Sequence, residues 1–585
     1  MAYTLEQILA ALGKVENGGI MVADLQSLPE CATIGTNKMY LSGGWDMEAE
    51  RKTYEHRYPS RRSVVYSDRG MVCTSQALAA QTGLDMLKRG GNAVDAAVAT
   101  AIAMTVLEPT SNGLGSDAFA IVWSEEEKKL FGLNGSGWAP RLLTRDAMRR
   151  AGFQTMPARG WASVTVPGAP SAWAELHRRF GRLPFQELFG PAIGYAESGV
   201  PTQPVTSYLW AQDEEAFAPY RDEPAFAPFF ETFLDGGAPK PGERRRFPCH
   251  AKTLRRLAET GCESYYRGSI AAAIDAFSRA TGGYLRREDL ELYRTEWVEP
   301  IRLSYHGWDV CEIPPNGHGI VALMALNILQ HLGTRAGRDD EDTVHRQLEA
   351  MKLAFTDGME YITDPRCMRM DTGYLLSDAY AARRAAEIGA EALLPHPVDP
   401  DCGGTVYLCV ADGEGNMVSF IQSNFQGFGS GITIPGLGIS LNDRASSFRL
   451  DEWAANVLVP GKKPYHTIIP GFLMKDGRPV GPFGVMGGYM QPQGHVQLLM
   501  NLLDFGLDAQ EALDALRWQW TGGKKIMLEE GFGAGVAQAL RDRGHEITVA
   551  RDFTGFGRGQ VILRGEDGVL RGATEPRADG AVAAW

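Results

Sequence analysis

The sequence predicts a large protein of mixed α/β class, and three observations lead to this fold class. The chain has 585 residues, of which 44% are hydrophobic and 22% charged, a composition typical of a folded protein with a sizeable core. Several long segments repeat apolar residues at helical spacing, whereas short apolar runs between turn residues indicate strands. A chain of this length forms either several domains or one large α/β body with insertions.

The first predicted elements are two helices within residues 75–107. This segment is rich in alanine at helical spacing and is interrupted by Arg89-Gly90-Gly91-Asn92, so we expect a glycine turn with the second helix starting near Asn92. The elements predicted after it are, in order, a buried strand at 118–123, helical stretches alternating with proline-rich loops between 157 and 277, an apolar helix at 320–332 and an amphipathic helix at 342–362.

A β-hairpin is predicted in the last third of the chain. Residues 405–411 and 417–422 flank the turn sequence Asp412-Gly413-Glu414-Gly415-Asn416. The segment 393–404 before the hairpin holds three prolines, two aspartates and two glycines, which exclude a continuous helix or a central strand. We expect that segment to be exposed and mobile, so that Thr405 is the first residue of a strand with a free segment before it.

Thr405, which follows Gly403-Gly404, is the main candidate functional residue. A threonine hydroxyl is a weak nucleophile and needs a base beside it. Cleavage of the bond between Gly404 and Thr405 would free the α-amino group of Thr405, which can then serve as that base. Taken alone, the same pattern is only a turn and the start of a strand.

Composition excludes several classes of function. The formal charge of -13 argues against a nucleic-acid partner. The chain begins without a secretory signal and contains no apolar run long enough for a membrane span, so a cytoplasmic protein is expected. The eight cysteines show no CxxC spacing, so neither a zinc site nor a disulfide framework is indicated, and nothing calls for a metal or an organic cofactor.

Several motifs in one order resemble those of the γ-glutamyltranspeptidase family, which are N-terminal-nucleophile hydrolases. The resemblance runs from about Gly70 to the C-terminus. The motifs are Gly70-Met71-Val72, Gly83-Leu84-Asp85, Gly90-Gly91-Asn92-Ala93-Val94-Asp95-Ala96-Ala97, Glu108-Pro109-Thr110-Ser111-Asn112-Gly113, Val166-Pro167-Gly168, Pro314-Pro315-Asn316-Gly317, Phe428-Gly429-Ser430-Gly431 and Met486-Gly487-Gly488.

The resemblance implies a four-layer αββα sandwich and a precursor that cleaves itself at Gly404–Thr405. The large subunit would be residues 63–404, preceded by an extension of unknown role at 1–62, and the small subunit residues 405–585. The two would form a heterodimer or a dimer of heterodimers. The catalytic residues implied are the nucleophile Thr405, Ser423 as a second hydroxyl that orients it, and the oxyanion-hole pair Gly487 and Gly488.

The sequence departs from the family in the substrate pocket. Ser136 stands where γ-glutamyl enzymes have an arginine that binds the substrate α-carboxylate, and other positions of the recognition set are also changed. Arg444 replaces a residue that receives the substrate α-amino group, and a cation repels such a group. The substrate-binding candidates are therefore Ser136, Phe425, Arg444, Ser447, His466 and Thr467.

Structural interpretations of these residues remain open. Ser423 is either a catalytic support or a strand serine, and Gly487-Gly488 could be a tight turn alone. Arg444 could pair with Asp443 at the surface or form a salt bridge elsewhere, and His466 could be a hydrogen-bonded structural histidine. Trp138 and Phe425 could belong to the core instead of the pocket.

The intact acyl-transfer residues and the altered pocket resemble the divergent branch of the family that includes oxamate amidohydrolase and acylases. The resemblance implies hydrolysis or acyl transfer on a small-molecule amide, with Arg444, together with His466, binding a carboxylate near the scissile bond. Two alternatives stay open: a glutathione hydrolase acting on γ-glutamyl compounds, and an unprocessed pseudoenzyme that binds ligands or partners.

Overall fold

The computed structural model describes residues 62–333, 337–395 and 404–585, all of which lie in one compact unit. Apart from Arg62, the expected N-terminal extension lies outside the described residues. Most of the proline-rich segment before Thr405, residues 396–403, also lies outside them, so its expected mobility is a prediction on which the structure gives no information.

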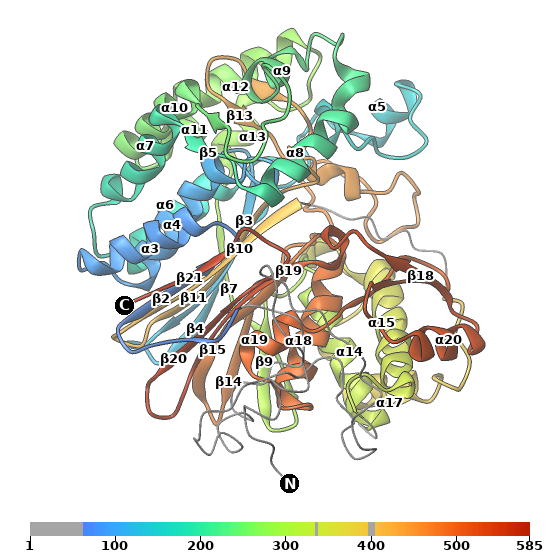
Figure 1. The fold of residues 1–585 in the computed structure, drawn as a ribbon. Coiled ribbons are helices and arrows are strands. Elements are labelled where there is room, and N and C mark those ends of the chain that lie inside the picture. The colour runs from blue at the N-terminus through green and yellow to red at the C-terminus, as the bar shows by residue number, and fades with distance from the viewer. Residues whose placement is uncertain (1–61, 334–336, 396–403) are drawn as a thin grey trace, which may run out of the picture. The chain divides into compact units, whose positions relative to one another are not determined.

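Two antiparallel seven-stranded sheets form the centre of the molecule (Figure 1). The first sheet has the order β1 (Val65–Ser67), β20 (Leu570–Thr574), β19 (Arg558–Arg564), β15 (Arg478–Met486), β14 (Gly471–Lys475), β9 (Trp308–Glu312) and β8 (Ile301–Tyr305). The second has the order β21 (Ala581–Ala584), β2 (Gly70–Thr74), β10 (Gly404–Asp412), β11 (Met417–Phe425), β3 (Asp117–Ser124), β4 (Lys129–Gly135) and β7 (Glu296–Val298).

Helices cover the outer face of each sheet, while the inner faces pack on one another through β10, β15 and β19. On the second sheet lie α3 (Ala77–Lys88), α4 (Ala93–Leu107) and α6 (Ala169–Phe180), and on the first lie α14 (Gly319–Leu332), α18 (Met490–Leu503) and α19 (Ala509–Asp514), with α15 (Glu341–Tyr361) packed on α14. This is the predicted four-layer αββα sandwich.

The remaining elements lie around this sandwich. The helices are α5 (Arg145–Arg150), α7 (Gly190–Ser198), α8 (Pro204–Phe217), α9 (Ala227–Phe233), α10 (Pro248–Thr260), α11 (Glu263–Arg267), α12 (Ser269–Ala280), α13 (Arg287–Leu292), α16 (Thr372–Leu375), α17 (Asp378–Ala385) and α20 (Ala534–Asp542). The short strands are β5 (Val200–Pro201), β6 (Arg244–Arg245), β12 (Thr433–Ile434), β13 (Ile439–Ser440), β16 (Trp518–Trp520), β17 (Lys525–Glu529) and β18 (Glu546–Ala550).

Local sequence explains the boundaries of the first helices. Asn92 caps α4 by accepting from the N–H groups of Val94 and Asp95, and the Asp95 carboxylate accepts from the Asn92 N–H in return. This reciprocal capping box satisfies N–H groups that have no partner within the helix. Asp412, at the hairpin turn, accepts from the N–H of Ala93 and so joins the start of α4 to the end of β10. The predicted helices, strand and hairpin are confirmed within a few residues at each end.

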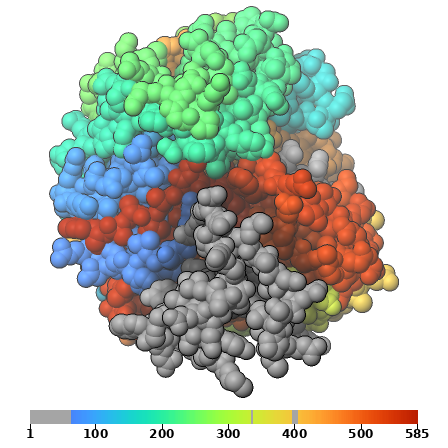
Figure 2. All heavy atoms as spheres, in the orientation of Figure 1, coloured from blue at the N-terminus to red at the C-terminus, as the bar shows by residue number. Residues whose placement is uncertain are grey.

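Segments from the two ends of the chain pair with one another in both sheets. β21 pairs with β2, and β20 pairs with β1. In the space-filling view, segments from the beginning of the chain in blue and from its end in red lie side by side on one face (Figure 2). A break in the chain between these segments would therefore leave a large shared interface.

In the described ranges, every helix is too short or too polar to cross a lipid bilayer.

Gly484→Ala is expected to lower the stability of the fold. A Cβ at this position of β15 would lie 2.5 Å from the ring of Tyr407 on the facing sheet, and overpacking of this kind costs roughly 1–3 kcal/mol. The midpoint of denaturant-induced unfolding measures the loss. Gly194→Ala in α7 is the control, because open space surrounds that position and alanine in a helix gains roughly 0.5–1 kcal/mol over glycine. Equal midpoints for both variants would contradict tight packing between the sheets.

Candidate active site

An irregularity in the β10–β11 pairing determines where Thr405 lies. Gly404 pairs with Phe425 and Val406 pairs with Gln422, so two residues of β11 lie opposite Thr405 alone. Such a bulge re-aims side chains near the end of a strand pair. It brings the hydroxyl groups of Thr405 and Ser423 to 3.1 Å from one another.

The hydroxyl of Thr405 lies beside the peptide bond that precedes it. Thr405 is fully buried, and its Oγ1 donates to the carbonyl oxygen of Gly404 at 2.8 Å. The Ser423 hydroxyl donates to the same carbonyl oxygen at 2.7 Å and accepts from the N–H of Phe425. The backbone at Gly404 is crowded, because an added Cβ would lie 3.3 Å from the Cα of Ser111. The hydroxyl of the candidate nucleophile, the Gly404 carbonyl and a second donor to that carbonyl are thus in mutual contact.

The glycine pair lies between β15 and α18. Gly487 and Gly488 have φ values of 133° and 57°, a region that side chains with a Cβ rarely adopt. Gly488 is one helical turn before Gln491, whose side chain donates to Thr405 Oγ1 at 3.4 Å. The structure therefore brings the region of the glycine pair close to Thr405. Gln491 is not among the site residues predicted from the sequence; its position three residues after Gly488 was the available indication.

Arg444 is fully buried at the N-terminal end of a short 3₁₀ helix, Arg444–Ser447. Its Nη1 donates to Thr467 Oγ1 at 2.6 Å, and its guanidinium carbon lies 4.3 Å from the ring centroid of Phe425. Among the described residues, no atom accepts a hydrogen bond from its Nε or Nη2. The surface ion pair with Asp443 that the sequence allowed is wrong, because Arg444 has no exposed surface. The site contains a buried cation with two donor nitrogens that lack partners in the part of the chain that the structure describes.

Burial shifts the pKa values around Arg444. Desolvation lowers the pKa of Arg444 to about 10, partly offset by the nearby carboxyls of Asp117 and Asp443. Desolvation raises the pKa of Asp117 to about 7 and that of Asp443 to about 7, although positive neighbours oppose the rise. Arg444 is therefore charged at neutral pH, and its two carboxyl neighbours titrate near neutrality.

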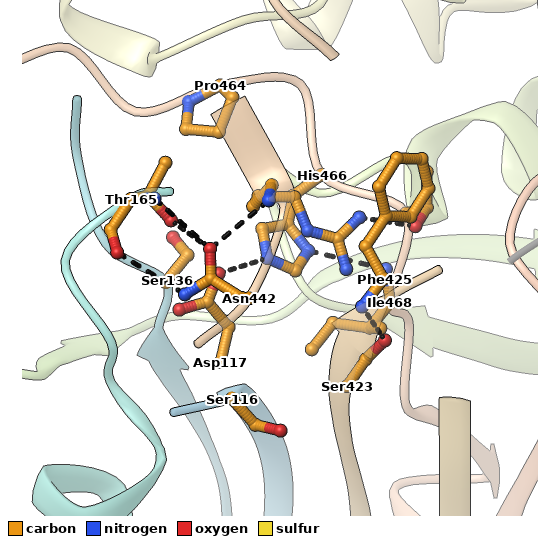
Figure 3. A network of polar contacts seen from close by, with 12 residues as sticks. Ser116, Asp117, Ser136, Thr165, Ser423, Phe425, Asn442, Pro464, His466 and Ile468 are labelled. Carbon is orange, nitrogen blue, oxygen red and sulfur yellow. Dashed lines mark hydrogen bonds and ion pairs between the residues drawn. The ribbon is translucent and has the colours of Figure 1, made fainter. Parts of the chain in front are cut away.

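Both ring nitrogens of His466 form hydrogen bonds within the protein (Figure 3). Nε2 lies 2.9 Å from the Asp117 carboxylate, and Nδ1 accepts from the N–H of Ile468 at 3.4 Å. Since Nδ1 is an acceptor, the neutral ring carries its proton on Nε2 and donates it to Asp117. Burial, reinforced by the charge of Arg444, holds the pKa of His466 well below its ordinary value. These contacts give His466 a supporting position behind Arg444.

The other pocket candidates differ in their surroundings. Ser447 borders the cleft and donates to the carbonyl oxygens of Arg444 and Tyr465. Ser136 is fully buried and bonded to Asn134 and Asn316, away from the cleft wall. Trp138 packs against Tyr293, as expected for a core aromatic.

A cleft of about 1770 Å³ opens beside these residues. Its wall includes Phe425, which has a positive φ of 87°, and Tyr489, which follows Gly488. Phe425 thus contacts Arg444 with its ring, Ser423 with its N–H and the cleft at once. Thr405, in the described uncut chain, is not part of the cleft wall. A substrate that enters the cleft would contact Phe425 before it reaches the hydroxyl groups of Thr405 and Ser423.

One group among the described residues has the side chains of a metal site: His345, Glu349 and His545. The two histidines share a hydrogen bond of 2.9 Å. The buried ammonium of Lys352 lies 2.7 Å from the Glu349 carboxylate and already supplies a cation there. A metal ion would be repelled by it. Lys352 and Glu349 instead bind the carbonyl oxygen and the N–H of Leu393, which indicates a structural network.

Comparison with known proteins determines the family. The family model described as gamma-glutamyltranspeptidase matches residues 79–585, which is most of the chain. The chain belongs to the gamma-glutamyltranspeptidase family. It is similar to the glutathione hydrolase-like YwrD proenzyme of Bacillus subtilis (strain 168), with 35% identity over 525 residues, 88% of this chain and 98% of that protein. It is also similar to the oxamate amidohydrolase proenzyme of Klebsiella pneumoniae, with 36% identity over 533 residues, 89% of this chain and 99% of that protein.

Among solved structures, the cephalosporin acylase from Bacillus halodurans is 55% identical to this member of the family. The two superpose with a TM-score of 0.87 over 91% of this chain and 98% of that one. The predicted resemblance and the N-terminal-nucleophile fold class are confirmed. The protein is an enzyme of the hydrolase or transferase type, as its relatives are. Several of those relatives are named as proenzymes, in agreement with a precursor that is cleaved.

Ligands whose carboxylate contacts Arg444 are expected to bind more weakly as the pH rises through about 7, because Asp117 and Asp443 both have pKa values of about 7. Below that pH both carboxyls are protonated and Arg444 is uncompensated; above it two negative charges compete with the ligand. His466 and His318 stay neutral in this range, since burial lowers both pKa values well below normal. The inhibition constant of a small carboxylate, measured on both sides of neutrality, tests this.

The control for this titration is Asp443→Asn. The amide oxygen can still accept from the N–H of Gln426, as Oδ1 of Asp443 does at 3.1 Å. The variant is expected to reduce the pH dependence of the inhibition constant without abolishing it, because Asp117 still titrates at about 7. Binding that is independent of pH in the unmodified enzyme would contradict the assigned electrostatics.

Proposed function

We propose that the enzyme is a self-processing amidohydrolase or acyltransferase whose nucleophile is Thr405 and whose substrate is a small amide with a carboxylate on the acyl side. The observation that carries the proposal is Arg444, a buried cation whose Nε and Nη2 lack partners among the described residues. Contacts run from its guanidinium to Phe425, from Phe425 to Ser423 and from Ser423 to Thr405. An acyl group bound at Thr405 would place a nearby carboxylate within this chain of contacts.

Maturation is the first step. Thr405 Oγ attacks the carbonyl carbon of Gly404, and the Ser423 hydroxyl stabilises the negative charge on the carbonyl oxygen to which it already donates at 2.7 Å. The C–N bond breaks as the proton lost by Oγ passes to the departing nitrogen, which becomes the α-amine of Thr405, and an ester joins Gly404 to Oγ. Water hydrolyses the ester. The products are a large chain, 63–404 with the extension 1–62, and a small chain, 405–585.

Turnover uses the amine that maturation creates. The α-amine of Thr405 accepts the hydroxyl proton while Oγ adds to the substrate amide, and the N–H groups of Gly487 and Gly488 stabilise the oxyanion. The proton passes to the leaving amine, and the acyl group stays on Oγ. Water or an acceptor amine then releases it.

The charge of Arg444 supports a carboxylated substrate over a γ-glutamyl one. Buried donors without partners favour an anion that accepts two hydrogen bonds, and a guanidinium matches a carboxylate in this way. The name of the Klebsiella relative refers to oxamate, in which a carboxylate adjoins an amide. Other relatives are named glutathione hydrolases, but the α-ammonium of a γ-glutamyl group would be repelled by Arg444.

Thr405→Ala is expected to leave the chain uncut and inactive, because no hydroxyl remains to attack Gly404. Denaturing electrophoresis and the N-terminal sequence of the smaller product, which should begin Thr-Val-Tyr-Leu, provide the measurement. Thr405→Ser is the matched control, since it keeps a hydroxyl and should still be cleaved. Full activity in material whose backbone is intact at Gly404 would overturn the proposal.

Arg444→Met is expected to reduce kcat/KM by roughly 10²-fold for amides with an acyl-side carboxylate, because charged hydrogen bonds contribute about 1.5–3 kcal/mol. Neutral amides of the same size should change little. Steady-state kinetics with oxamate, N-oxalyl or N-succinyl amines, their uncharged analogues and glutathione provide the comparison.

Arg449→Met serves as the control for that series, because Arg449 is a solvent-exposed arginine in the cleft wall, to which the buried Arg444 does not belong. It should leave the preference for carboxylated amides unchanged. A marked preference of the unmodified enzyme for glutathione would contradict the assignment of the pocket.

A further inference from the structure

Gln491 is a buried, uncharged side chain in the first turn of α18 that touches the proposed nucleophile. It has no exposed surface, and its Nε2 donates to Thr405 Oγ1 at 3.4 Å. Its Oε1 accepts from the backbone N–H of Ile469 at 3.0 Å. Since a backbone N–H can only donate, this bond determines which end of the amide is oxygen and leaves the NH₂ group directed at Thr405.

We propose that Gln491 is a catalytic residue that stabilises negative charge on Thr405 Oγ when this oxygen is the leaving group of an ester; the inference rests on the proposed function. The protein holds the amide in place before reaction, because both its acceptor and its donor are engaged. A donor of this kind acts like one donor of an oxyanion hole, but on the threonine oxygen instead of the carbonyl oxygen.

The step concerned occurs twice, in maturation and in turnover. Water adds to the ester carbonyl carbon while the α-amine of Thr405 takes one proton from it. The C–Oγ bond then breaks, its electron pair moves to Oγ, and the ammonium group returns the proton to Oγ. The Gln491 side chain donates a hydrogen bond to Oγ while this oxygen gains the electron pair of the broken bond. Hydrolysis of the ester yields a carboxylic acid and the free hydroxyl, so no further reactant is required.

A glutamine suits this position better than a charged residue. A lysine or arginine here would lower the pKa of the α-amine of Thr405, which must accept protons. A carboxylate would oppose the charge that develops on Oγ. A neutral amide donates without either effect, and its bond to Ile469, three residues after His466, ties it to the segment that also holds Thr467 against Arg444.

Gln491→Glu and Gln491→Met test the role of the donor. Glutamate keeps the size of the side chain and an acceptor for Ile469 but cannot donate when ionised, and methionine removes both hydrogen bonds. We expect ester hydrolysis to slow by roughly 10–10²-fold, less than for a full oxyanion-hole donor because the contact is long. In mature enzyme, kcat and KM should fall together with kcat/KM nearly unchanged, since acylation is spared.

The acyl-enzyme should also accumulate. A pre-steady-state burst approaching one product per active site and an acylated small chain in the mass spectrum are the direct readouts, and maturation should pause at an ester that hydroxylamine cleaves. Gln497→Glu is the matched control. Gln497 is a buried glutamine of the same helix whose amide contacts Gln493 and Trp518 instead of Thr405.

Three results would overturn the inference. They are an unchanged kcat in both Gln491 variants, a joint fall of kcat and KM in Gln497→Glu as well, or a loss of kcat/KM in the Gln491 variants without accumulation of acyl-enzyme. If the proposed function itself is wrong, the result is different, because the Thr405→Ala variant would then remain active. Thr405-dependent activity without any effect at Gln491 would remove only the role of Gln491.

Discussion

The contact between Thr405 Oγ1 and the carbonyl oxygen of Gly404 is the interaction on which the rest of the structure depends. It exists because the bulge in the β10–β11 pairing sets Thr405 opposite two residues of β11, one of which is Ser423. β10 lies inside the second sheet, between β2 and β11, and is buried from Thr405 to Asp412. A side chain anchored in such a strand has little freedom, so the hydroxyl is held in a position that a flexible loop could not maintain.

Arg444 illustrates a different physical constraint. Burial of a guanidinium costs free energy unless hydrogen bonds and opposite charges compensate for the lost water. Here compensation is incomplete: Thr467 and the Phe425 ring contact the group, Asp117 and Asp443 lie near it, and two of its nitrogens lack partners among the described residues. A buried cation whose charge is only partly compensated is stabilised further when an anionic ligand binds to it. The preference for the proposed substrate over a γ-glutamyl compound therefore depends on the residues of the pocket, and not on the acyl-transfer residues that the chain shares with its family.

The distribution of strands explains how a cut chain would stay assembled. Each sheet takes strands from before and after the proposed cleavage point: β1 and β9 pair with later strands in one sheet, and β2 and β3 do so in the other. Cleavage at Gly404–Thr405 would therefore separate no layer of the sandwich. The new amine would form at the end of a strand whose hydrogen bonds to both neighbours persist.

The sequence by itself determined the elements that depend on local interactions. The turn at Arg89-Gly90-Gly91-Asn92, the cap of α4 and the hairpin around Asp412 follow from residues a few positions apart. The family motifs then predicted the layer architecture and supported Thr405 as the candidate nucleophile. Only the tertiary structure decided that Arg444 is buried, that His466 is occupied by Asp117 and Ile468, and that Gln491 reaches Thr405. These contacts join residues from separate strands, loops and helices, and their geometry arises from the packing of two sheets, which no local pattern encodes.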